Sequence, residues 1–102
     1  MKHVMKFKFQ DKEGFLSFVE KDQFNYALVQ KDTPKVIDIQ KTHKLHISYE
    51  LKLPVYHEVE ADVIFDQSLI EWVYHQLESE KNLYFKELND QLCVIRLPKE
   101  SD

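Results

Sequence analysis

The sequence predicts an α+β fold, in which a mainly antiparallel sheet of six strands carries two packed helices. Several short stretches alternate apolar and polar side chains, which is the pattern of strands that bury one face. Another stretch, from Gln67 to Glu80, repeats its apolar side chains at helical spacing. The central strands are joined by short connections, and short connections favour antiparallel pairing.

The N-terminal part of the chain predicts a strand followed by a helix. Residues 3–9 alternate in polarity, as expected for a strand with one buried face. Asp11 can cap a helix over residues 12–21, because its carboxylate can accept a first-turn N–H. We expect that helix to bury a face made of Phe15, Leu16, Phe18 and Val19.

Five further strands are predicted downstream. Phe24–Gln30 is followed by turn residues at Asp32-Thr33-Pro34, so Val36–Gln40 is expected to return as its hairpin partner. The longest period-two run predicts a strand over Leu45–Leu53, which Pro54 ends or bends. The other two predicted strands are Val55–Phe65 and Leu92–Leu97.

The second helix has the clearest pattern in the chain. Either Asp66 or Ser68 can cap its first turn. Its apolar stripe is formed by Leu69, Ile70, Val73, Tyr74 and Leu77. Trp72 and Tyr74 could stack on a planar ligand, but we interpret them as packing residues. A short apolar cluster of Leu83, Tyr84 and Phe85 follows the helix.

Composition limits the classes of function. At 102 residues the chain predicts a single domain over residues 1–102. A net charge of −4 with one arginine, Arg96, argues against a nucleic-acid partner. No apolar run approaches the ~20 residues of a membrane span, so no membrane partner is expected. A lone cysteine and no signal-peptide pattern favour the cytoplasm. Because Gly14 is the only glycine, phosphate-binding glycine loops are excluded.

Three segments resemble one known family. FLSFVEKDQFNYALVQKDTPKVIDI resembles the opening helix, strand, turn and return strand of the FMN-binding split barrels, the pyridoxamine 5′-phosphate oxidase-like superfamily. VEADVIFDQSLIEWVYHQL is similar to that family's later strand and helix, with Ala61 in place of the usual glycine. The final LCVIRLPK is similar to its closing strand, so the resemblance covers about residues 15–98. It implies a six-stranded split barrel with FMN held at a homodimer interface, and an oxidoreductase-like function.

The chain departs from that family where the flavin phosphate is normally gripped. A longer basic segment is reduced here to Lys41-Thr42-His43-Lys44, without arginine. The resemblance therefore implies that FMN, if bound, meets Lys41 and Lys44 as point charges. A solvated strand start is the other interpretation of these lysines. The alternative function is a dimeric α+β module that binds a small-molecule ligand or a protein without catalysis, so enzyme activity stays undecided.

Three other groups of side chains could carry chemistry. His43 and His46 could bind a metal with His57, Glu58 or Glu60, but strand positions three apart face opposite ways, so we predict no metal. An alternating row of carboxylates, Glu58, Glu60 and Asp62, could act in acid–base chemistry, although an exposed sheet face is the simpler interpretation. Cys93 lies inside an apolar strand and is expected to be a buried, unreactive thiol.

Overall fold

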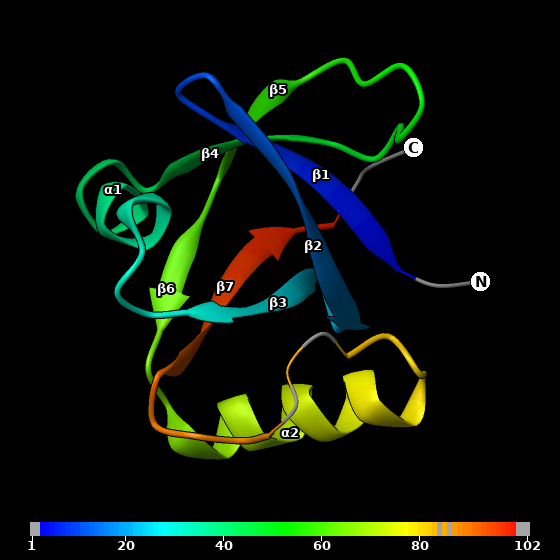
Figure 1. The fold of residues 1–102 in the computed structure, drawn as a ribbon, viewed down its shortest axis with the longest axis vertical. Helices are drawn as coiled ribbons and strands as arrows, with labels where there is room; N and C mark the ends of the chain where they lie inside the picture. The colour runs from blue at the N-terminus through cyan, green and yellow to red at the C-terminus, as the bar shows by residue number, and fades with distance from the viewer. Residues whose placement is uncertain (1–2, 84, 86, 100–102) are drawn as a thin grey trace.

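Seven antiparallel strands form one sheet that curls into a nearly closed barrel, and two helices pack against it (Figure 1). The computed structural model describes residues 3–83, 85 and 87–99. The elements are β1 (Val4–Phe9), β2 (Lys12–Lys21), β3 (Phe24–Gln30), α1 (Pro34–Thr42), β4 (Lys44–Ser48), β5 (His57–Glu60), β6 (Asp62–Ile64), α2 (Gln67–Ser79) and β7 (Leu92–Pro98). The strand order is β5-β4-β1-β2-β3-β7-β6. The predicted α+β barrel is confirmed, with seven strands in place of six.

One bent strand closes the barrel. β5 pairs with β4, and β6 pairs with β7, although only Ala61 separates β5 from β6. Ala61 is buried, and its N–H donates to the carbonyl of His43 (3.0 Å). The predicted strand Val55–Phe65 is thus correct in its centre, but its two halves pair with different strands, β4 and β7. Because the two ends of the sheet follow each other directly along the chain, neither is left as a long open edge.

Strand β2 also changes partners along its length, and this leaves a split in the barrel wall between β2 and β3. Its first part, Lys12 to Ser17, pairs with β1, and its second part pairs with β3. The ladder between β2 and β3 stops at Phe18 opposite Ala27. β3 nevertheless stays paired with β7 as far as Gln30. The two strands therefore diverge beyond Phe18, and residues 15–17 separate from residues 28–30.

The helix predicted over residues 12–21 is wrong, because this stretch is strand β2. Its central residues are buried on both faces of the sheet. Leu16 and Phe18 pack into the barrel core, whereas Val19 packs under α2. A strand buried on both faces reads as a continuous apolar run, and such a run also fits one face of a helix.

The strand predicted over Val36–Gln40 is also wrong, because these residues belong to helix α1. Pro34 starts this helix, since its fixed φ suits the first helical position. Val36 and Ile39 are buried at helical spacing, and His43 ends the helix in the left-handed conformation. The β-branched residues favour a strand locally, but the helix buries them against the barrel core.

The strand predicted over Leu45–Leu53 ends early, at Ser48. The Ser48 hydroxyl donates to the Glu50 carbonyl (3.1 Å) and accepts from the N–H groups of Glu50 and Val55 (3.1 and 3.3 Å). This side chain replaces the next ladder bonds and folds the chain into a loop. Leu51 and Leu53 consequently lie in the loop, 41% and 83% exposed.

Helix α2 is confirmed and covers one end of the barrel (Figure 1). Asp66 is its cap and accepts from the N–H groups of Ser68 and Leu69 (2.9 and 3.3 Å). The helix buries Ile70, Val73, Tyr74 and Leu77 against the outer face of β2, β3 and β7. Of the predicted cluster after the helix, Leu83 and Phe85 pack here, and Tyr84 lies outside the described residues. No helix in the described part is long and apolar enough to cross a membrane.

We predict that Leu77→Ala lowers the free energy of unfolding by about 2–5 kcal/mol, because Leu77 is 1% exposed and its removal leaves a cavity. Leu53→Ala removes the same atoms from an exposed loop and should change stability by less than about 0.5 kcal/mol. Urea denaturation of both variants checks this, and equal midpoints would contradict the proposed core role of α2.

Candidate functional site

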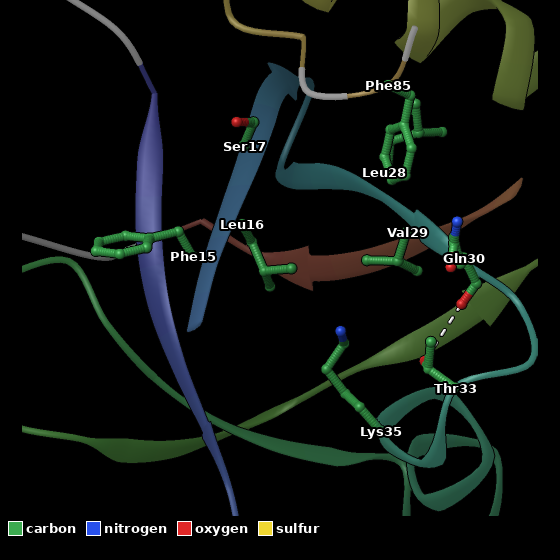
Figure 2. Close-up of a pocket in the computed structure, with 9 residues that line it drawn as sticks. All are labelled: Phe15, Leu16, Ser17, Leu28, Val29, Gln30, Thr33, Lys35 and Phe85. Atoms are coloured by element: carbon green, nitrogen blue, oxygen red, sulfur yellow. Dashed lines mark hydrogen bonds between the residues drawn. The ribbon is translucent and has the colours of Figure 1, made fainter. Parts of the chain in front are cut away.

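A cavity of about 380 Å³ lies in the split between β2 and β3 (Figure 2). It is lined by Phe15, Leu16, Ser17, Leu28, Val29, Gln30, Thr33, Lys35 and Phe85. Leu16 and Val29 belong to the barrel core, whereas Leu28 belongs to the core under α2. The cavity therefore crosses the barrel wall. Its volume falls in the range of about 300–1,000 Å³ that is typical of small-molecule sites.

The split leaves backbone groups facing the cavity. The N–H of Phe18 donates to the His3 carbonyl on the β1 side (3.0 Å). Because backbone groups alternate along a strand, those of Phe15 and Ser17 face β3. Neither residue is in the β2–β3 ladder, which stops at Phe18. The walls of this apolar cavity thus present unpaired backbone donors and acceptors.

Lys35 supplies the only ionisable side chain among the described residues that line this cavity. It extends from the first turn of α1, and Figure 2 shows its ammonium pointing between Leu16 and Val29. Lys35 forms no ion pair with another described residue. Burial therefore lowers the pKa of the Lys35 ammonium below its ordinary value. A half-buried ammonium without a carboxylate favours an anionic ligand group.

The polar end of the cavity lies where β3 leads into α1. The Thr33 hydroxyl donates to the Gln30 carbonyl (3.2 Å) and does not cap the helix. The first-turn N–H groups of α1 thus keep their partial positive charge beside the Lys35 side chain. Ser17 is already engaged, because its hydroxyl donates to the Asn82 side chain (3.2 Å). Charge in this cavity is consequently concentrated at the end formed by Lys35.

Lys41 and Lys44 are not among the residues that line this cavity. Lys41 is exposed in the last turn of α1, and Lys44 is exposed at the start of β4. A cation in a last helical turn offsets the negative end of the helix dipole, so Lys41 has a structural use. Whether either lysine meets a phosphate stays a prediction.

The predicted histidine candidates are distributed along the sheet edge. His43 lies 3.3 Å from Asp62 (Nδ1 to Oδ1), and His46 lies 3.9 Å from Glu58 (Nε2 to Oε2). Within the described ranges, no group of three or more His, Cys, Asp or Glu side chains could hold a metal ion. These residues therefore form separate exposed pairs.

The row of carboxylates and the cysteine are not brought together as a catalytic group. Glu58 and Glu60 are exposed on β5, whereas Asp62 on β6 accepts from the Arg96 guanidinium (3.1 Å). Cys93 is fully buried, as predicted, and burial raises the pKa of its thiol to about 11. A thiol held neutral in this way is a poor nucleophile.

Sequence reasoning missed Lys35, although two signals pointed to it. Thr33 followed by Pro34 marks a helix start as well as a turn. A lysine in the following position lies at the positive end of the helix dipole, where a cation is unfavourable. Such an unfavourable placement is an indication of function. The other lining residues come from distant segments, so their proximity leaves no local pattern in the sequence.

Comparisons with known proteins identify the fold. No family model matches the sequence, and no curated protein matches it. The structure is similar to a Listeria innocua protein provisionally assigned as a pyridoxamine 5′-phosphate oxidase, with a TM-score of 0.60 and 17% identity over 97% of this chain and 84% of that one. It is also similar to General Stress Protein 26 from Bacillus anthracis, with a TM-score of 0.59 and 20% identity over 94% of this chain and 77% of that one. The chain therefore has the split-barrel fold that its sequence predicted.

We predict that Lys35→Met stabilises the ligand-free protein at neutral pH, because it removes a half-buried charge without a carboxylate partner. The folded-state pKa of Lys35 lies below the ordinary value of 10.5. Between these two pKa values the unfolded chain binds more protons, so the parent gains stability as pH rises through that window. The advantage of Lys35→Met should accordingly shrink as pH approaches 10.5, as measured by urea unfolding at several pH values. An advantage that does not change with pH would contradict this account.

Proposed function

We propose that this chain is a flavin-binding split-barrel protein that holds FMN in the cavity between β2 and β3. The observation that supports this proposal is an apolar cavity with one ammonium, Lys35, at its polar end. One of the two structural neighbours with this barrel fold is provisionally assigned as a pyridoxamine 5′-phosphate oxidase. FMN combines a planar ring system with one phosphate, so its two parts match the two ends of the cavity.

The lining residues fit FMN in chemistry. Leu16, Leu28 and Val29 provide apolar surface for the flat ring system, and the open backbone edge of β2 can hydrogen-bond the polar edge of the ring. The phosphate would lie at Lys35 beside the start of α1, where a lysine and helix N–H groups favour an anion. Bound flavin supplies electron- and hydride-transfer chemistry, and the protein binds and orients it.

The chain's own residues would contribute binding more than proton transfer. Among the described residues of the cavity lining, Lys35 is the only ionisable side chain. Any acid–base step would therefore need a group from the substrate or from a second chain. We propose a homodimer for this reason and because Phe15, at the cavity, leaves 52% of its surface exposed. A second chain packed on Phe15 would bury this ring and complete the cavity wall.

The second candidate function is a non-catalytic module that binds a small ligand or a protein. One observation favours it. The only arginine, Arg96, is paired with Asp62 and stacked on the ring of Phe24 (4.7 Å to the centroid), so it does not line the cavity. A single lysine holds a phosphate as a point charge and not in a bidentate manner.

We predict that the purified protein quenches FMN fluorescence on binding and that Lys35→Gln weakens FMN affinity about tenfold or more, because a charge-assisted contact is lost. Affinity in the parent should fall as salt concentration rises. Lys52→Gln removes an exposed lysine outside the cavity and should leave FMN binding unchanged.

The same titration tests the second location for the phosphate. If Lys41 and Lys44 hold it, replacing both with alanine abolishes FMN binding while Lys35→Gln has little effect. Loss on Lys35→Gln with an unchanged double variant supports the cavity between β2 and β3. An absence of FMN binding by the parent would overturn the flavin proposal and leave the non-catalytic module.

We predict a homodimer at micromolar concentration, measured by light scattering as twice the mass of the chain. Phe15→Ser should shift the protein toward monomers, because it replaces an exposed aromatic ring at the proposed interface with a polar side chain. Leu53→Ser is the matched control, since Leu53 is 83% exposed in a loop elsewhere. A monomeric parent would remove the interface, and dissociation by Leu53→Ser alone would place it at the loop.

A further inference from the structure

The only glycine of the chain lies where an aromatic ring covers its backbone. Gly14 on β2 is opposite Phe7 on β1. A Cβ atom at Gly14 would lie 2.7 Å from both Cε1 and Cζ of the Phe7 ring. Gly14 does not have a positive φ, so its backbone conformation suits any residue. Glycine is therefore required here because the Phe7 ring occupies the space that a Cβ atom would fill.

The Phe7 ring in turn holds the ammonium of Lys35. Lys35 Nζ lies 4.4 Å from the centroid of the ring, which is cation–π distance. The nearby carboxylate of Glu13 does not compete for this ammonium, because it accepts from the Tyr56 hydroxyl and pairs with Lys6 (3.7 Å). Gly14, Phe7 and Lys35 thus form a stack, and we call it the Gly14–Phe7–Lys35 stack.

This stack stands between two cavities. A second cavity, of about 270 Å³, is lined by Phe7, Phe9, Gln10, Lys12, Glu13, Thr33, Pro34 and Lys35. It shares Thr33 and Lys35 with the cavity between β2 and β3, but Phe7 lines only the second cavity. The Lys35 side chain can therefore point into either cavity. With the ring in place, the ammonium is held at the boundary; without the ring, the second cavity is open to the flexible lysine side chain.

We infer that Phe7, seated on Gly14, is a positioning residue that directs the Lys35 ammonium toward the phosphate of a flavin in the cavity between β2 and β3. This inference rests on the proposed function and adds a specificity determinant to it. The stack discriminates FMN from riboflavin, because the two flavins share their ring system and differ in the phosphate that Lys35 would meet. Loss of the ring should lower affinity for FMN while affinity for riboflavin stays the same.

The experiment measures the affinities of FMN and riboflavin by fluorescence titration at low salt, for the parent, Phe7→Leu, Gly14→Ala, the Phe7→Leu/Gly14→Ala double variant and Lys35→Gln. The ratio of FMN affinity to riboflavin affinity should fall about three- to tenfold in each single Phe7 or Gly14 variant, as expected for a partly desolvated cation–π contact. Lys35→Gln should lower this ratio at least as far. Gly14→Ala acts by displacing the ring, so adding it to Phe7→Leu should cause no further fall.

The outcomes separate this inference from the proposed function. If the parent binds neither flavin, both fail. If the parent prefers FMN and Lys35→Gln removes that preference, but Phe7→Leu and Gly14→Ala keep it, flavin binding stands and the positioning role is overturned. An equal loss of FMN and riboflavin affinity in Phe7→Leu would also overturn it, since that result is general damage to the cavity. Thermal unfolding of each variant confirms that the titrated protein is folded.

Discussion

The divergence of β2 from β3 beyond the Phe18–Ala27 pair is the constraint on which the structure depends. β2 must pair with β1 along its first part and with β3 along its second part, so the barrel wall cannot stay continuous. α1 enters directly after β3 and packs Val36 and Ile39 against the barrel core near this split. The cavity is therefore a consequence of the topology, and Lys35 reaches it because α1 begins where the two strands separate.

The Lys35 side chain lowers the stability of the folded state. An ammonium that is half-buried without a carboxylate and located at the positive end of α1 is unfavourable for the folded state. The Phe7 ring offsets part of that cost, and Gly14 makes room for the ring. Proteins keep such local costs where a ligand compensates for them, and the surrounding core supplies the stability. The large apolar clusters inside the barrel and under α2 have that role here.

The sequence predicts the elements whose patterns are local and one-sided. α2 is capped by Asp66 and has one apolar stripe, so its prediction is accurate. β2 is misread as a helix because both of its faces are buried, which removes the alternation that identifies a strand. The candidate functional site is harder to predict from the sequence than the helices and strands. Lys41 and Lys44 stand out because they lie close together in sequence. The surroundings of Lys35 come from β2, β3 and the segment after α2, so they leave no local pattern.

The placement of the single arginine explains why recognition of an anion would fall to one lysine. Arg96 on β7 lies opposite Asp62 on β6, and their ion pair links the two strands that close the barrel. Its guanidinium also stacks on Phe24 of β3. The Arg96 guanidinium, which could bind an anion in a bidentate manner, thus stabilises the β6–β7 pair. The cavity between β2 and β3 has only the Lys35 ammonium, which acts as a point charge. Because a point charge has no preferred geometry, its direction must be set by packing, and in this barrel the packing comes from the Phe7 ring on the chain's only glycine.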